Sequence, residues 1–186
     1  SIMKKLLFVF GLFLVTNLVM SQNKLYITRA GSVSFDAGTG LEDITGVNKV
    51  TEAAIEPSSG KIQFKMLIKG FEFKSQLMQD HFNENYMESD KYPKSTFKGT
   101  ITNLSSVNFS ANGTYPVNVS GKLMIHGVEK DVQTKGSLKV SGSNVIATAD
   151  FSVVLDDYKI AIPGVVKDKL AKKAKIKVNC TYSLQK

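Results

Sequence analysis

In the segment KIQFKMLI, residues 61–68, every second side chain is apolar and falls on one face of an extended chain: Ile62, Phe64, Met66 and Ile68. The positions between them up to residue 65 carry lysine or glutamine. A period of two is typical of a β-strand with one face buried and the other in water. The segment therefore predicts a half-buried strand.

The same alternation recurs in three later segments, residues 117–125, 132–140 and 175–184. Turn-forming residues separate the segments at 30–31, 38–40, 58–60, 112–113, 127 and 141–143. Short strands at regular spacing predict an all-β antiparallel meander. Gly70 changes the parity between Ile68 and the pair Phe71 and Phe73, which predicts a bulge or bend that lets the sheet curl closed.

Two segments depart from the alternation. In residues 75–89, Met78, Phe82 and Tyr86 recur at every fourth position and predict a short amphipathic helix. Residues 163–171 begin with proline and predict a second short helix or a loop. Neither segment is long enough for a two-layer α/β fold, and no linker separates domains.

The first residues read as a leader. Lys4 and Lys5 precede an apolar run over residues 6–15, and Val19 and Ser21 are small enough to precede a cut at Gln22. The run is shorter than the roughly 18 to 20 residues that cross a bilayer, which favours a signal peptide over a retained anchor. We therefore expect a signal peptide over residues 1–21, one domain over residues 22–186, and a periplasmic or secreted bacterial protein.

Composition excludes several classes of protein. The domain over residues 22–186 retains 22 basic and 16 acidic side chains, but Arg29 is the only arginine of the chain and tryptophan is absent. Nucleic-acid surfaces use guanidinium groups and stacking aromatics, so nucleic acid is not an expected partner. Cys180, the only cysteine, cannot form a disulfide within the chain, and its strand parity predicts a buried apolar group.

Catalytic and metal motifs are weak. His81 falls in the predicted helix and His126 in a turn at a strand end, each without a histidine, cysteine or carboxylate at a metal-ligand spacing. No serine lies in a nucleophile elbow, and residues 38–40 lack the lysine of a phosphate loop. The carboxylate pairs at 42–43 and 156–157 are interpreted as solvated strand ends. We expect no cofactor, no metal and a structural role for both histidines.

The inward positions carry an unusual load of aromatic and methionine side chains. A curled sheet of about eight strands is either filled by its own side chains or holds one slender ligand. Flexible methionines and large rings suit an apolar tunnel and an ordinary core equally well. The residues expected to line the interior, with those of the helix packed over a ligand, are Phe64, Met66, Phe71, Phe73, Met78, Phe82, Tyr86, Phe97, Leu123, Ile125, Phe151 and Val153.

Two segments carry distinctive motifs: the run LMQDHFNENYMESDKYPKSTFKGTI, residues 77–101, and the hairpin GKLMIHGVEKDV, residues 121–132. Both resemble the YceI-like family of exported lipid-binding and polyisoprenoid-binding proteins. The opening strand at 32–35 and the closing strand at 175–184 also fit. The resemblance implies an extended, lipocalin-like antiparallel barrel whose interior receives a long isoprenoid or acyl chain. Met78 and Gln79 stand where family members often carry Arg-Asp.

Three functions follow as hypotheses. The first is non-catalytic binding, storage or transport of an amphiphilic lipid such as a polyisoprenoid, an isoprenoid quinone or a fatty acid. The second is an enzyme acting on such a lipid with His126 or His81 as general base, and the third is a filled-core interaction barrel. Lysines gathered over residues 167–177 are either a solvated face or a basic rim that contacts an anionic membrane transiently. Oligomeric state stays open.

Overall fold

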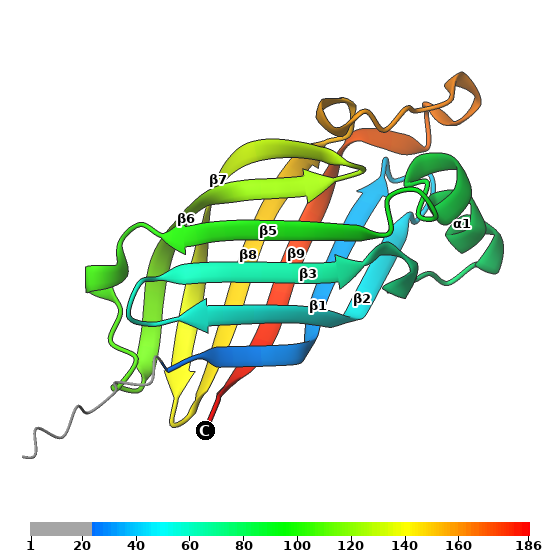
Figure 1. The fold of residues 1–186 in the computed structure, drawn as a ribbon. Helices are drawn as coiled ribbons and strands as arrows, with labels where there is room; N and C mark the ends of the chain where they lie inside the picture. Colours follow the sequence, from blue (N-terminus) through cyan, green and yellow to red (C-terminus); the bar gives the residue numbers. More distant parts are fainter. Residues whose placement is uncertain (1–23) are drawn as a thin grey trace, which may run out of the picture.

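The computed structural model describes residues 24–186, which form a closed antiparallel β-barrel (Figure 1). The nine strands of this region are β1 Tyr26–Gly38, β2 Thr45–Glu56, β3 Lys61–Leu67, β4 Phe71–Glu72, β5 Lys94–Ile101, β6 Gly113–Ile125, β7 Val128–Ser141, β8 Asn144–Val154 and β9 Leu170–Leu184. They pair in the order β1, β9, β8, β7, β6, β5, β3, β2, and β2 pairs again with β1. Eight long strands therefore close the barrel, which confirms the predicted fold.

The predicted bend at Gly70 is confirmed. A 3-10 turn, η1 Ile68–Gly70, follows β3, and the two-residue strand β4 then pairs with β2 at Val47 and Asn48. The strand that begins at Lys61 thus pairs with β2 and β5 before the turn and with β2 alone after it. This bend lets Ile68 and Phe71 both enter the core, where they are 1% and 6% exposed.

The predicted helix is present but shorter than residues 75–89. It consists of α1 Gln76–His81, continued by the single π-helical turn η2 Phe82–Tyr86. Ser75 caps it, because its hydroxyl accepts a hydrogen bond from the Met78 amide at 3.4 Å. The helix ends before Glu88, whose φ of 46° lies in the left-handed region.

The expected second helix or loop, residues 163–171, is a loop with one 3-10 turn. That turn is η5 Gly164–Val166. A second 3-10 turn, η4 Asp156–Tyr158, precedes it in the same loop between β8 and β9, and η3 Leu104–Ser106 lies in the loop between β5 and β6. The last two residues of the expected segment belong to β9, since Leu170 already pairs with Gly38 of β1.

One end of the barrel is closed by the loop between β5 and β6. Leu104, Val107 and Phe109 pack against a buried cluster at this end, and the Phe109 ring stacks on Tyr26 with the centroids 5.6 Å apart. The Tyr115 hydroxyl donates to the Ala111 carbonyl at 2.8 Å and fixes the end of the same loop. This loop forms a floor.

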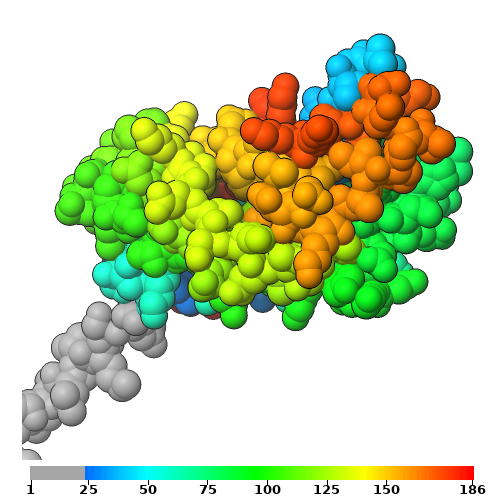
Figure 2. Space-filling view, turned by 90° about the horizontal axis from the view of Figure 1, so that it is seen from above, coloured from blue at the N-terminus to red at the C-terminus, as the bar shows by residue number. Residues whose placement is uncertain are grey.

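The opposite end carries three separate segments of chain. They are the helix α1 with η2, the loop between β1 and β2, and the loop between β8 and β9 (Figure 1). Figure 2 shows the orange β8–β9 loop beside the blue β1–β2 loop, with the green helical segment at the same end. No helix within residues 24–186 is long and apolar enough to cross a membrane.

The signal peptide expected over residues 1–21 lies outside the described residues.

Candidate functional site: an apolar cavity in the barrel

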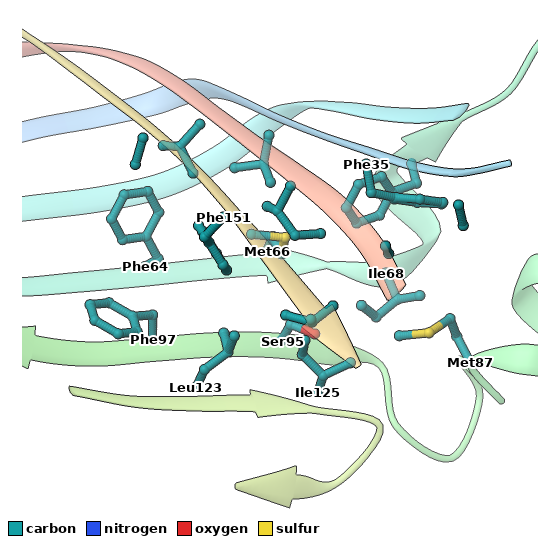
Figure 3. Close-up of a pocket in the computed structure, with 18 of the residues that line it drawn as sticks. Phe35, Phe64, Met66, Ile68, Met87, Ser95, Phe97, Leu123, Ile125 and Phe151 are labelled. Atoms are coloured by element: carbon teal, nitrogen blue, oxygen red, sulfur yellow. The ribbon is translucent and has the colours of Figure 1, made fainter. Parts of the chain in front are cut away.

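The barrel encloses a cavity of about 500 Å³, within the range of sites that take small organic ligands. Its wall consists almost entirely of apolar side chains from the inward positions of the strands (Figure 3). A filled-core barrel would have a solid interior. The cavity therefore argues against the hypothesis of a filled interaction barrel.

All twelve residues expected to line the interior lie on the cavity wall: Phe64, Met66, Phe71, Phe73, Met78, Phe82, Tyr86, Phe97, Leu123, Ile125, Phe151 and Val153. Nine of them come from strands or the segment after β4, and three come from the helical segment that covers the end. Their position is thus as expected. That they contact a ligand stays a prediction.

The deep part of the cavity is framed by two phenylalanines on adjacent strands. Phe64 of β3 and Phe97 of β5 are direct cross-strand partners, and their rings meet edge to face at 6.3 Å (Figure 3). The Phe97 ring needs the two glycines beneath it. A Cβ at Gly99 or Gly121 would lie 2.5 Å or 2.8 Å from the ring, so a larger residue would push it into the cavity.

Near the mouth the wall becomes an aromatic cluster around Phe35. The Phe35 ring lies 5.3 Å from those of Phe71 and Phe82 and 5.8 Å from that of Phe73. Phe35 was not among the residues expected to line the interior. It could have been predicted from the alternation in β1, where Val33, Phe35 and Ala37 share one face and all three line the cavity.

The mouth opens between the helix, the β1–β2 loop and the β8–β9 loop. Leu77 of α1 lines the cavity although 64% of it is exposed, which places it at the opening. The acidic, basic and imidazole side chains of the wall, Glu42, Lys169 and His81, lie on these three segments, whereas the strands contribute only hydroxyl groups, among them those of Ser95, Thr96, Thr134, Ser137 and Thr148. The charged groups of the site are therefore at its entrance, and its depth is mostly apolar.

Ion pairs tie these three segments together. Lys169 Nζ lies 3.4 Å from Glu42 Oε2, and Lys74 Nζ lies 2.6 Å from Asp43 Oδ2. The bond to Lys74 lowers the pKa of the Asp43 carboxyl, with a smaller effect from Thr45. The pair Glu42 and Asp43, interpreted from sequence as solvated, is half exposed and ion-paired.

His126 is a hydrogen-bonded residue outside the cavity wall. It occupies the two-residue hairpin turn between β6 and β7, where His126 and Gly127 have φ of 52° and 70°, as a type I′ turn requires. Its Nδ1 lies 2.9 Å from the Tyr158 carbonyl and its Nε2 lies 2.6 Å from Glu88 Oε2. The expected structural role of His126 agrees with these contacts.

Cys180 is buried, as its strand parity predicted. Its exposure is 0%, and burial raises the pKa of the thiol to about 11, partly offset by the Ser32 backbone. A thiol in this state is not a nucleophile at neutral pH. Within residues 24–186, no three histidine, cysteine, aspartate or glutamate side chains are grouped so as to hold a metal ion.

The fold and the site together define a closed antiparallel β-barrel that is hollow, apolar inside and open at one end. Residues 27–182 match the model of the YceI-like domain, so the chain belongs to the YceI-like family. This confirms the resemblance carried by the two sequence motifs. No curated protein matches the chain in sequence.

Solved structures share the fold at low sequence identity. A polyisoprenoid binding domain from Saccharophagus degradans, implicated in plant cell wall breakdown, aligns with a TM-score of 0.74 and 13% identity over 88% of this chain and 99% of that one. BcnA of Burkholderia cenocepacia aligns with a TM-score of 0.67 and 18% identity, over 81% of this chain and 95% of that one. The YceI protein of Campylobacter jejuni aligns with a TM-score of 0.61 and 16% identity, over 78% of this chain and 87% of that one.

Proposed function

We propose that this protein binds the hydrocarbon part of a long-chain lipid inside the barrel and carries or stores it without catalysing a reaction. The observation that carries the proposal is a single apolar cavity that extends from the Phe64 and Phe97 rings to the open end at Leu77. Burial of apolar surface is the interaction such a wall supplies.

The depth of the cavity sets the length of chain that it holds. On β9 the cavity wall extends from Ala174 near the mouth to Tyr182 at the floor, roughly 26 Å along the strand and roughly 20 Å along a barrel axis inclined by about 40°. Each carbon of an extended chain advances somewhat less than the ~1.5 Å of a C–C bond, so on the order of 15 carbons fit.

That length is enough to hold a ligand by burial. At about 0.8 kcal/mol per methylene, 15 carbons gain roughly 12 kcal/mol, which is comparable to the roughly 4 to 15 kcal/mol lost on association. A hydrocarbon chain can therefore be held with modest net affinity. A longer isoprenoid would keep its remaining units outside the mouth.

A polar head group fits the entrance better than the interior. The polar side chains of the wall that carry charge, Glu42 and Lys169, lie at the mouth and pair with each other. Met78 and Gln79 replace the Arg-Asp pair common in the family, so this part of the helix supplies no guanidinium to a head group. We therefore expect selection by chain length rather than by head group.

An isoprenoid is the preferred ligand class. The structural neighbour from Saccharophagus degradans is described as a polyisoprenoid binding domain, and this chain shares its fold. The methionine and phenylalanine wall also adapts to the methyl branches of an isoprenoid, because thioether side chains repack easily.

A non-catalytic role is supported by the placement of the histidines. Both ring nitrogens of His126 are in hydrogen-bond contact with Tyr158 and Glu88, and the residue is not part of the cavity wall. His81 lies at the mouth, away from the deep part of a bound chain. Turnover of an isoprenoid alcohol or ester that is lost in His81→Gln would overturn the non-catalytic role.

We also propose that the protein works after export, in the periplasm or outside the cell. The support is the pattern of residues 1–21, two lysines followed by an apolar run and small residues before Gln22. N-terminal sequencing of the protein from the secreting host tests it. A chain that still begins before residue 22, found in the cytoplasm, would contradict export.

The experiment that tests binding is extraction of the purified protein with organic solvent, followed by mass spectrometry. Uptake is then measured for isoprenoid alcohols and fatty acids of increasing length. Affinity should rise with each added carbon and level off at on the order of 15 carbons, the depth of the cavity. No extracted amphiphile and no uptake of any chain would overturn the proposal.

A further inference from the structure

Five large apolar side chains within residues 24–186 are mostly exposed: Leu41 at 74%, Val50 at 60%, Leu67 at 57%, Leu77 at 64% and Val165 at 93%. Leu41 is in the β1–β2 loop, Leu77 in α1 and Val165 in η5, the three segments around the cavity mouth. Val50 and Leu67 lie on β2 and β3 and are not part of the cavity wall. We call Leu41, Leu77 and Val165 the mouth patch.

Contacts between the loops hold the mouth patch together. The Thr39 hydroxyl donates to the Asp168 carbonyl at 2.5 Å, and the Thr39 amide donates to the Lys169 carbonyl at 3.1 Å. These bonds join the loop of Leu41 to the loop of Val165. The Lys74–Asp43 pair joins the start of α1, and with it Leu77, to the first of these loops.

The mouth patch is continuous with the apolar interior. Leu77 belongs to both, and Val166, the neighbour of Val165, also lines the cavity. If the mouth faces water, a hydrocarbon chain that leaves the cavity exposes its methylenes to water. If the mouth rests on a bilayer, the chain passes directly into hydrocarbon and its methylenes stay buried. Apolar side chains at an opening are thus suited to contact with hydrocarbon.

The charge next to the patch is basic on the side of Val165. Lys167, Lys172 and Lys173 are exposed and form no ion pair with any described residue. The carboxylates next to Leu41 are each held by a lysine, Glu42 by Lys169 and Asp43 by Lys74. Asp80 and Glu84 belong to a different segment, the helix. Over residues 165–173 these three lysines outnumber the one carboxylate, Asp168, whereas Asp156 and Asp157 lie at the other end of the β8–β9 loop. Free positive charge therefore lies where the loop of Val165 leads into β9.

We propose that the mouth patch docks the open end of the barrel on an anionic lipid bilayer, with Leu41, Leu77 and Val165 in the interface and Lys167, Lys172 and Lys173 at the head groups. Lysines next to a membrane are attracted by anionic lipid, and exposed aliphatic tips partition into the interface. Docking in this orientation brings the cavity mouth directly onto the hydrocarbon. This inference deepens the proposed function, since it supplies the path by which a lipid enters the cavity.

The test is co-sedimentation of the full chain with vesicles of phosphatidylcholine, alone or mixed with phosphatidylglycerol. The patch variant is Leu41→Ser with Val165→Ser, because neither residue lines the cavity. The matched control is Val50→Ser with Leu67→Ser, two side chains of similar chemistry on the barrel wall. Residues 1–23 are the same in every protein compared, so differences report the substituted sites.

Wild type should bind the anionic vesicles, and the patch variant should bind them about tenfold more weakly or worse, since two aliphatic side chains leave the interface. The control should bind like wild type. If both variants bind the vesicles more weakly to the same extent, or if both bind like wild type, the mouth patch is not the docking surface. Replacement of Lys167, Lys172 and Lys173 by glutamine should weaken binding to anionic vesicles and leave binding to neutral vesicles unchanged. If wild type binds neutral and anionic vesicles equally well, the preference for an anionic bilayer is wrong.

Uptake of a detergent-dispersed isoprenoid alcohol without vesicles separates this inference from the proposed function. The patch variant should keep wild-type uptake, because Leu41 and Val165 lie outside the cavity wall. Wild-type uptake with no vesicle binding would overturn docking and leave the binding function intact. Vesicle binding that depends on the patch, without uptake of any chain, would overturn the binding function and leave docking intact.

Discussion

Nε2 of His126 lies 2.6 Å from Oε2 of Glu88, and this contact joins the hairpin between β6 and β7 to the segment that follows the helical cap. The other ring nitrogen donates to the Tyr158 carbonyl, since a carbonyl oxygen only accepts. The three non-glycine residues with left-handed backbone among residues 24–186, Glu88, His126 and Lys159, all lie at this junction. Side-chain bonds at the junction thus hold an unfavourable backbone in place.

His126→Ala should lower the free energy of unfolding by about 2 to 3 kcal/mol, because it removes two hydrogen bonds, one of them to a carboxylate. Glu88→Gln keeps an acceptor for the ring and should cost less. Urea denaturation of the two variants and wild type measures the difference. A His126→Ala protein as stable as wild type would show that the junction does not stabilise the fold.

Phe64→Asp and Phe97→Asp should each abolish uptake of a hydrocarbon chain, since a charge without a partner in an apolar cavity is costly. Gln63→Asp is the matched control, because Gln63 is on the exposed face of the same strand. Far-UV circular dichroism establishes which variants fold. If the aspartate variants do not fold, Phe64→Asn should weaken uptake about tenfold, and full uptake by any folded Phe64 or Phe97 variant would contradict the prediction.

The helical cap, α1 with η2, is the expected gate of the cavity. Met78, Phe82 and Tyr86 project from it into the cavity, and burial raises the pKa of Tyr86. Amides of residues 76–86 should exchange with solvent more slowly when a chain is bound, because a bound chain adds contacts to a segment that opens locally. Amides in the β6–β7 ladder serve as reference. Unchanged exchange in the cap would argue against a gate there.

The Cys180 thiol should not react with a disulfide reagent at pH 8 in the folded protein and should react once urea unfolds it. Its pKa in the folded state, about 11, exceeds the ordinary value of 9.0. The proton is therefore held more tightly in the folded state, and the contribution to stability is complete below pH 9 and is lost as pH rises through about 11. Rapid labelling of the folded protein at pH 8 would contradict the burial of this thiol.

The strands and most of the cavity wall could be predicted because both depend on a local property. Side chains alternate between the two faces of a strand, so the polar neighbours of an apolar residue show that the apolar residue points inward. Phe64, Met66, Leu123 and Phe151 could be assigned to the inner face in this way. The capped helix could be predicted for the same reason, from Ser75 and the spacing of Met78 and Phe82. The end of the helix could not be predicted, because Glu88, just beyond it, is held by His126, which lies 38 residues away in the chain.

The sequence by itself thus determined an antiparallel meander, its inward face and its family, because the alternation of side chains and the turn residues act over a few positions. Only the tertiary structure decided that the interior is hollow, since the width of a barrel depends on how many strands close it and at what tilt. It also decided that the segments of Leu41, Leu77 and Val165 lie at the same end of the barrel, around the mouth. Three loops far apart in the chain bring them there, and the contacts that hold these loops, Thr39 with Asp168 and Lys74 with Asp43, form only when the barrel closes.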